Sequence, residues 1–306
     1  MPPPDFVIAG APKCGTTALY YYLKQHPAIF MPSCKEPHFF GDDLPPFHRK
    51  YETLEAYQAI FDAASPGQLC GEASVLYMHS DVALARLQAH NPDVKSIAVL
   101  RNPVDLFVSW HNQCYKRLDE HYADPKQAWN AQKARKAGQD ISGTCRHPEL
   151  LVYGDVCALG TRLEHFIREV PAERRLILFY DDLVDNTVGT YSFILDFLGL
   201  EQVDDIAFEK KNVSVKPRSM RLEKLLQYPP LGLDVLRSKF KPVLNHYGIY
   251  PSRFLRQLNY RPVKYTLDPD FRAQLVTTLT PEIEKIELLT GRNLSHWRQV
   301  EGVCHD

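Results

Sequence analysis

The sequence predicts an α/β fold, in which one domain is built on a central parallel sheet flanked by helices. Three buried apolar runs are typical of strands, and each leads into a helical pattern; they are Phe6–Gly10, Ser96–Leu100 and Arg174–Tyr180. Strands that alternate with helices of this length indicate βαβ units, and therefore parallel strands. A chain of 306 residues, 44% of them hydrophobic, is long enough to bury the core that such a fold needs.

Helices are expected where apolar residues recur at helical spacing and where proline or glycine marks an end. Pro27 ends the first of them, and Gly199 and Gly291 end two later ones. A short strand and turn is expected over 69–74. No repeat or linker interrupts this order, so we expect a single domain over residues 5–300. The expected helices cover residues 16–26, 54–64, 79–90, 103 onward, 153–169, 181–198 and 270–289.

Charge and composition limit the partners that the chain can have. Lys and Arg (36 residues) nearly balance Asp and Glu (37 residues), so bulk charge gives no reason to expect a nucleic-acid partner. There is no apolar run of membrane-spanning length and no signal core near the start, which favours a cytoplasmic protein or a soluble catalytic domain cut from a longer one. Seven scattered cysteines without a C-x-x-C pair argue against a zinc site, so we expect no metal.

The segment that follows the first strand has the composition of an anion-binding loop. It reads Ala-Pro-Lys-Cys-Gly-Thr-Thr over residues 11–17 and opens directly into a helix. Backbone N–H groups and a helix N-terminus can hold a phosphate there, and a lysine adds positive charge. The residues expected to bind the anion are Lys13, Cys14, Gly15, Thr16 and Thr17.

A second candidate anion site follows another strand. Arg101 comes directly after Ser96–Leu100, and Ser109 lies two helical turns further on. Ligands of open parallel sheets bind at the carboxyl ends of the strands, where both sites would lie. Two anion sites at one edge predict a ligand with two separated phosphate groups.

Two other functions remain open at this point. A kinase or nucleoside triphosphatase needs G-x-x-x-x-G-K-[ST]. Gly10 and Gly15 have the right separation, but Lys13 precedes the second glycine, while Asp181 and Asp182 could act as magnesium ligands. The other alternative is a non-catalytic protein that binds an adenine nucleotide.

Taken in order, these motifs resemble the sulfotransferases that use 3′-phosphoadenosine-5′-phosphosulfate (PAPS). The 13–17 loop is similar to their 5′-phosphosulfate loop, and Leu100–Pro103 with Ser109 is similar to their 3′-phosphate site. The segment Lys35–Phe40 (Lys-Glu-Pro-His-Phe-Phe) resembles the K-E-x-H-F-F segment of the branch that sulfates glycosaminoglycans. The resemblance extends over nearly the whole chain.

The resemblance implies a P-loop NTPase-like fold and transfer of a sulfuryl group from PAPS to a hydroxyl or amine, with 3′-phosphoadenosine-5′-phosphate (PAP) as product. The acceptor would be a small molecule or a carbohydrate. Lys13 would neutralise the leaving phosphate oxygen, and Glu36 would be the general base, with His38 as second candidate. Further cofactor contacts are expected at Tyr153, Arg218 and Arg261.

The chain departs from the glycosaminoglycan branch at two places. Ala73 stands where that branch has a lysine, and Asn259-Tyr260-Arg261 stands where it has K-G-R. These departures argue against a heparan-type polymer as acceptor. Acceptor specificity is expected in a helical insertion or flap at 118–148, in the loop Pro37–Pro46 and in the region 228–262.

Overall fold

The computed structural model describes residues 3–45, 48–209, 215–230, 251–263 and 266–299. The chain divides into two compact units, each of which is considered by itself. The first unit comprises Met1–Trp110, Val152–Asn212 and Leu267–Val303, and the second comprises His111–Leu151, Val213–Thr266 and Cys304–Asp306. The assignment of residues 5–300 to one functional domain stays a prediction.

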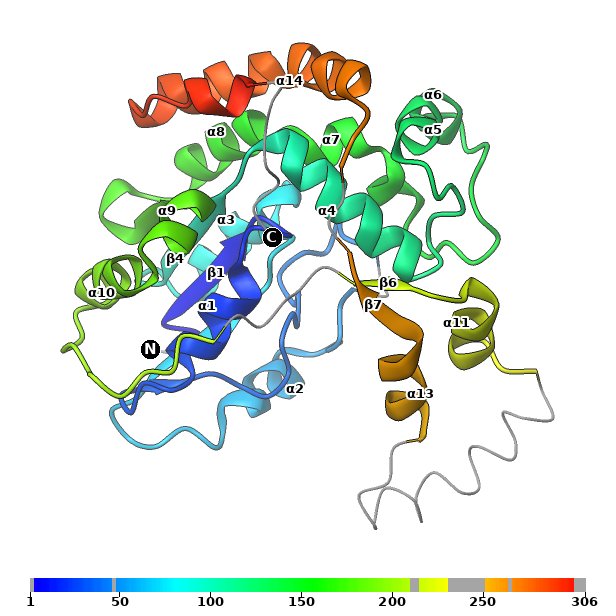
Figure 1. The fold of residues 1–306 in the computed structure, drawn as a ribbon. Helices are drawn as coiled ribbons and strands as arrows, with labels where there is room; N and C mark the ends of the chain where they lie inside the picture. The colour runs from blue at the N-terminus through cyan, green and yellow to red at the C-terminus, as the bar shows by residue number, and fades with distance from the viewer. Residues whose placement is uncertain (1–2, 46–47, 210–214, 231–250, 264–265, 300–306) are drawn as a thin grey trace. The chain divides into compact units, whose positions relative to one another are not determined.

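The first unit is built on a five-stranded sheet in which every pairing is parallel (Figure 1). The prediction of an α/β fold with a parallel sheet is therefore confirmed. The central strand is buried along its whole length, as expected of a parallel strand that is covered on both faces. In spatial order the strands are β2 (Ile29–Phe30), β3 (Leu69–Ala73), β1 (Phe6–Gly10), β4 (Lys95–Leu100) and β5 (Arg175–Phe179).

The helices of the first unit flank this sheet, and α8 and α14 run side by side (Figure 1). A Cβ atom on Gly160 of α8 would lie 2.4 Å from the Glu282 carbonyl oxygen of α14, so only glycine allows this close approach. Helix α4 begins in the first unit and ends in the second. The helices are α1 (Thr16–Leu23), α2 (Leu54–Gln58), α3 (Ala83–His90), α4 (Pro103–Lys116), α7 (Tyr153–Cys157), α8 (Leu159–Glu169), α9 (Tyr180–Asp185), α10 (Thr187–Leu198) and α14 (Pro269–Thr290).

Side chains set several helix boundaries that apolar spacing alone predicted wrongly. Helix α3 begins at Ala83 rather than at residue 79, because the Ser80 hydroxyl accepts the Ala83 N–H at 2.9 Å. The helix expected over 181–198 is divided at Asn186, whose side chain accepts the Gly189 N–H at 2.9 Å and caps α10. The helix expected over 153–169 is divided at Ala158, whose backbone is not helical.

Other expected helices are shorter than their patterns. Helix α1 ends at Leu23, and the Gln25 and His26 N–H groups bond three residues back, which tightens the last turn before Pro27. The helix expected over 54–64 continues beyond α2 only as a 3₁₀ turn, Ala59–Phe61.

The second unit contains short helices and a two-stranded antiparallel sheet. Within 118–148, the expected insertion, the helices span only six and five residues. Residues 231–250 of the expected specificity region lie outside the described residues. The elements of this unit are α5 (Pro125–Asn130), α6 (Gln132–Lys136), β6 (Val215–Pro217), α11 (Met220–Gln227), α13 (Pro251–Asn259) and β7 (Tyr260–Pro262).

None of the helices in the described ranges combines the length and the apolar character that crossing a membrane requires.

Candidate active site

The loop between β1 and α1 has the backbone shape of an anion cradle. Gly15 has φ +80° and stands at the N-cap of α1, where no side chain caps the helix. The first N–H groups of α1 are therefore not taken up by a capping side chain. Lys13 also lies in the left-handed region, with φ +63°, and is half-buried.

Neighbouring elements hold this loop in place. The Ala11 N–H donates to the Val99 carbonyl of β4 at 3.0 Å. A Cβ atom on Gly15 would lie 2.7 Å from Leu183 and 3.0 Å from Tyr180, both on α9. Glycine is therefore required at this position for two reasons: the φ angle is positive, and α9 leaves no space for a Cβ atom.

Arg101 joins the two predicted anion sites. Its Nη1 donates to the Lys13 carbonyl oxygen at 3.0 Å, and its guanidinium carbon lies 4.5 Å from the centroid of the Tyr180 ring. Arg101 is only 7% exposed, so the stacked ring and the loop fix its planar head. Ser109 is half-buried on α4. Sequence reasoning missed Tyr180, although an aromatic residue directly after β5 was a usable signal.

The segment Lys35–Phe40 is attached to the end of β3. The Glu36 N–H donates to the Ala73 carbonyl at 3.1 Å. The Glu36 side chain is 35% exposed, and its Oε1 forms an ion pair with Lys35 Nζ. His38 Nε2 lies 4.0 Å from Glu36 Oε2, so the two candidate bases are adjacent.

Three neighbouring strands bring the predicted residues to one edge of the sheet. β3, β1 and β4 are adjacent and parallel, so their carboxyl ends share that edge. Glu36 is bonded to the end of β3, whereas Lys13 and Arg101 directly follow β1 and β4. This edge of the sheet therefore combines a carboxylate with a lysine and an arginine.

Burial sets the ionisation of two groups near this edge. His38 is 1% exposed, and burial lowers its pKa to about 3, so the imidazole is neutral at neutral pH. Among the residues that the structure describes, neither of its ring nitrogens has a hydrogen-bond partner. Burial also raises the pKa of Glu72, on β3, to about 7, while hydrogen bonds from hydroxyl groups oppose that rise. Sequence reasoning assigned Glu72 no role, although a carboxylate in a buried strand was a signal.

Other predicted contacts differ in their surroundings. The Cys14 thiol is buried, donates to the Pro12 carbonyl at 3.4 Å, and has its pKa raised to about 12 by burial, so only its backbone can face an anion. Tyr153 is fully buried and packs edge-on against Phe107, with ring centroids 5.1 Å apart. Its assignment as a cofactor contact stays a prediction.

Arg218 and Arg261 belong to the second unit. Both are exposed; Arg261 lies on β7, and Arg218 directly follows β6. The Arg218 N–H donates to the Asn259 carbonyl at 2.6 Å. Their predicted contact with a cofactor stays a prediction.

The two aspartates that a magnesium nucleotide site would need are used in packing. Asp181 Oδ2 accepts the Trp297 Nε1–H at 2.6 Å and lies 3.0 Å from His296 Nε2. Asp182 forms a two-point ion pair with Arg292. No group of three or more His, Cys, Asp or Glu side chains within the described ranges could hold a metal ion.

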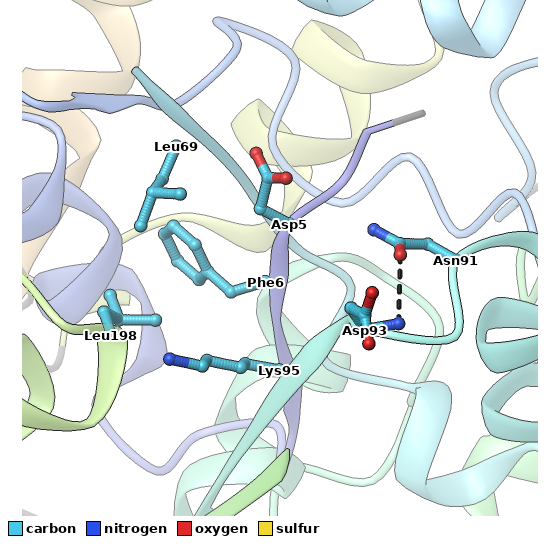
Figure 2. Close-up of a pocket in the computed structure, with 7 residues that line it drawn as sticks. All are labelled: Asp5, Phe6, Leu69, Asn91, Asp93, Lys95 and Leu198. Atoms are coloured by element: carbon cyan, nitrogen blue, oxygen red, sulfur yellow. Dashed lines mark hydrogen bonds between the residues drawn. The ribbon is translucent and has the colours of Figure 1, made fainter. Parts of the chain in front are cut away.

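A pocket of about 160 Å³ lies at the opposite edge of the sheet, where β1 and β4 begin (Figure 2). Its charged groups already have partners. Asp5 accepts the Cys70 N–H at 2.7 Å, and Lys95 Nζ donates to the Phe197 carbonyl at 2.7 Å. Because ligands of parallel sheets bind at the carboxyl ends of the strands, this pocket is not the candidate active site.

Comparison with known proteins agrees with the geometry of this edge. The sulfotransferase domain family matches residues 3–220, and the chain belongs to that family. The predicted family, the enzyme class and the donor PAPS are thereby confirmed.

Among curated relatives, the chain is 28% identical over 201 residues to human heparan sulfate glucosamine 3-O-sulfotransferase 3B1, which covers 65% of this chain and 47% of the relative. It is 26% identical over 275 residues to human bifunctional heparan sulfate N-deacetylase/N-sulfotransferase 1, covering 83% of this chain and 30% of the relative. The chain thus spans half or less of these two human relatives.

A solved sulfotransferase structure from Alicyclobacillus acidocaldarius has the same fold. It superposes with a TM-score of 0.72 at 22% identity, over 98% of this chain and 100% of that one.

Proposed function

We propose that this chain transfers a sulfuryl group from PAPS to a hydroxyl or amine of a carbohydrate, with Glu36 as the general base. The observation that carries the proposal is the shared edge of the sheet: Lys13 and Arg101 follow β1 and β4, and the backbone of Glu36 is bonded to the carboxyl end of the adjacent strand β3.

The residues at this edge fit a donor that carries two phosphate groups. When bound, PAPS supplies a sulfuryl group activated by its bond to the 5′-phosphate, and it carries a second phosphate at the 3′ position. The first N–H groups of α1, which no side chain caps, and Lys13 suit the first phosphate. Arg101, held by the loop and by Tyr180, suits the second, with the Ser109 hydroxyl as a further donor.

In an in-line transfer, the leaving phosphate and the attacking acceptor lie on opposite sides of the sulfuryl group, so Lys13 and Glu36 have different roles. Lys13 stabilises the negative charge that grows on the leaving phosphate oxygen. Glu36 accepts the proton that the attacking hydroxyl or amine releases. Its half-exposed carboxylate can meet an acceptor arriving from solvent, whereas the buried imidazole of His38 cannot do so without movement.

The carbohydrate class rests on two kinds of support. Both human relatives named above are, by their names, sulfotransferases of heparan sulfate, and the name of the first specifies its glucosamine. The charges of Lys35 and Glu36 balance each other in their ion pair, and Lys50, whose Nζ donates to the Lys35 carbonyl, adds a positive charge beside Glu36. This charge favours an acceptor that already bears anionic groups. Ala73 stands where the glycosaminoglycan branch has lysine. We therefore expect the acceptor to differ from that of the branch, either in the position that receives the sulfuryl group or in the length of the carbohydrate chain.

The donor is tested by equilibrium binding. We expect PAP to bind without metal and more tightly than ATP with Mg²⁺. Tighter binding of ATP that depends on Mg²⁺ would contradict the proposed donor site.

The acceptor and the base are tested together with sulfate-labelled PAPS. We expect label in glucosamine oligosaccharides and none in a simple phenol. Glu36→Gln should lower kcat about 10²–10⁴-fold while the affinity for PAP stays within about twofold, because the base acts only on the acceptor. The control is Glu55→Gln, an exposed carboxylate in the first turn of α2. Label in the phenol alone would overturn the carbohydrate assignment, and normal turnover in Glu36→Gln would remove Glu36 as the base.

A further inference from the structure

The segment that carries Glu36 lies in an unusual backbone conformation. Glu36 has φ +60° and His38 has φ +50°, and neither residue is glycine. Such residues adopt the left-handed region only where surrounding contacts hold them there. The direction of the Glu36 side chain therefore depends on what holds the backbone of residues 36–40.

Three backbone N–H groups of this segment are bound by the end of β3 and the turn after it. The Glu36 N–H donates to the Ala73 carbonyl at 3.1 Å. The N–H groups of residues 38 and 40 donate to side-chain hydroxyls. His38 N–H donates to Ser74 Oγ at 2.9 Å, and Phe40 N–H donates to the Tyr77 hydroxyl at 3.2 Å.

Those two hydroxyls are in turn oriented by one buried carboxyl group. Glu72 is 1% exposed. Its Oε2 accepts the Ser74 hydroxyl at 2.6 Å, its Oε1 accepts the Tyr57 hydroxyl at 3.3 Å, and the Tyr77 hydroxyl also faces it. A hydroxyl that donates its proton to a carboxylate keeps its lone pairs free to accept a backbone N–H.

We infer that Glu72 is a positioning residue for the proposed reaction: through Ser74 and Tyr77 it holds the backbone of residues 36–40 in the shape that presents Glu36 to the acceptor. The inference rests on the proposed function for its catalytic consequence. Its structural part, the Glu72–Ser74–His38 linkage, can be measured without any acceptor.

The first test is hydrogen exchange of the peptide that spans residues 36–40. Ser74→Ala removes the acceptor of the His38 N–H, and Glu72→Gln replaces one of the two acceptor oxygens with an NH2 donor, so that one oxygen must serve the hydroxyls of Ser74, Tyr57 and Tyr77. Each variant should raise the exchange rate of this peptide at least about tenfold while the affinity for PAP stays within about twofold. The matched control is Ser96→Ala on β4, a buried serine whose hydroxyl has no hydrogen-bond partner within the described part of the chain. Unchanged exchange in Ser74→Ala would overturn the inference.

The second test uses turnover with glucosamine oligosaccharides as the acceptor. Ser74→Ala and Glu72→Gln should each lower kcat about tenfold, and the double variant should lose little more, because the two side chains act in one linkage. Additive losses, or a loss confined to the affinity for PAP, would contradict the inference. If the wild-type protein modifies no carbohydrate, the acceptor class fails, while the exchange experiment still decides the role of Glu72. Thermal unfolding of each variant identifies any loss of kcat that is due to misfolding.

Discussion

Lys13 and Arg101 are 88 positions apart in the chain, yet one hydrogen bond connects them. Arg101 fixes the carbonyl of Lys13, whose side chain is the group that we propose to stabilise the leaving phosphate. The same arginine is oriented by the ring of Tyr180. Each of the two cations therefore has a separate position, which suits a ligand with separate anionic groups.

Replacing Lys13 by methionine should lower kcat about 10²–10³-fold, because a charge that stabilises the leaving oxygen is removed at similar side-chain length. Binding of PAP should weaken much less. The measurement is steady-state turnover beside calorimetric binding of PAP. Lys24→Met is the control, since Lys24 is exposed beyond the end of α1. Equal losses in both variants would contradict the assigned role.

His38 makes stability depend on pH in a defined direction. Its pKa is lowered to about 3 in the folded protein, whereas in the unfolded chain it is near 6.5. Below pH 6.5 the unfolded chain binds a proton that the folded protein does not, so the free energy of unfolding falls as pH falls toward 3.

Between pH 7.5 and 5.5, wild-type protein should lose about 1.4 kcal/mol more stability than His38→Gln, measured by urea unfolding at both pH values. His79, also buried and with its pKa lowered to about 4, contributes equally to both proteins and cancels. An identical pH dependence in the two proteins would show that folding does not lower the pKa of His38.

At the level of elements, the segment 118–148 is organised by one buried ion pair. Glu120 and Arg135 have fully buried side chains, and two Arg135 nitrogens lie 2.8 Å from the two Glu120 oxygens. Arg135 also donates to the Leu151 carbonyl at 3.2 Å, and Glu120 accepts the N–H groups of His121 and Tyr122 at 2.8 Å. From composition alone, the charged residues of this segment would be expected at a solvated surface. Glu120 and Arg135 instead form its buried centre.

Arg135→Met should reduce the free energy of unfolding by about 3–5 kcal/mol, because it leaves Glu120 buried without its counter-charge. Urea unfolding followed by tryptophan fluorescence measures this, since Trp129 lies in the same segment on α5. Lys133→Met, an exposed position on the same helix as Arg135, should change stability by less than about 0.5 kcal/mol. A loss below about 1 kcal/mol in Arg135→Met would mean that water reaches the pair.

Across the first unit as a whole, residues near the C-terminus connect the ends of two strands. Trp297 is 1% exposed; its indole N–H donates to Asp181 after β5, and its carbonyl accepts from Asn102 after β4 at 3.0 Å. Arg292 pairs with Asp182 on the same helix as Asp181. The helix that supports the phosphate loop is therefore held from a distant part of the chain.

Trp297→Ala should cost about 3–5 kcal/mol of stability, and Trp297→Phe clearly less, because phenylalanine retains most of the buried apolar area. Thermal unfolding beside PAP binding is the appropriate measurement, since the supporting helix contacts the loop at Gly15. Leu288→Ala is the control, because Leu288 is 85% exposed. A similar change in Trp297→Ala and in the control would show that the tail does not support the fold.

Much of this arrangement could be predicted from local pattern. Apolar runs located the strands β1, β4 and β5, and the lysine, glycine and threonines after β1 indicated the phosphate loop. Helix boundaries at Ser80 and Asn186 could not be predicted from apolar spacing, because they depend on hydrogen bonds from single polar side chains. The contact of Tyr180 with Arg101 and the role proposed for Glu72 also escaped prediction, since Arg101 lies far from Tyr180 in the sequence and the segment 36–40 lies far from Glu72.

The sequence by itself determined the α/β class and the family resemblance, because these depend on residue type and on short spacing; the phosphate loop stays a prediction. Only the tertiary structure decided which strands are neighbours, and hence that Glu36, Lys13 and Arg101 share one edge. It also decided which polar groups are buried: His38 and Glu72 receive their shifted pKa values, and Asp181 and Asp182 their packing partners, from residues remote in the chain. Burial and long-range contact arise only when the sheet and its helices pack together, so no local pattern in the sequence records them.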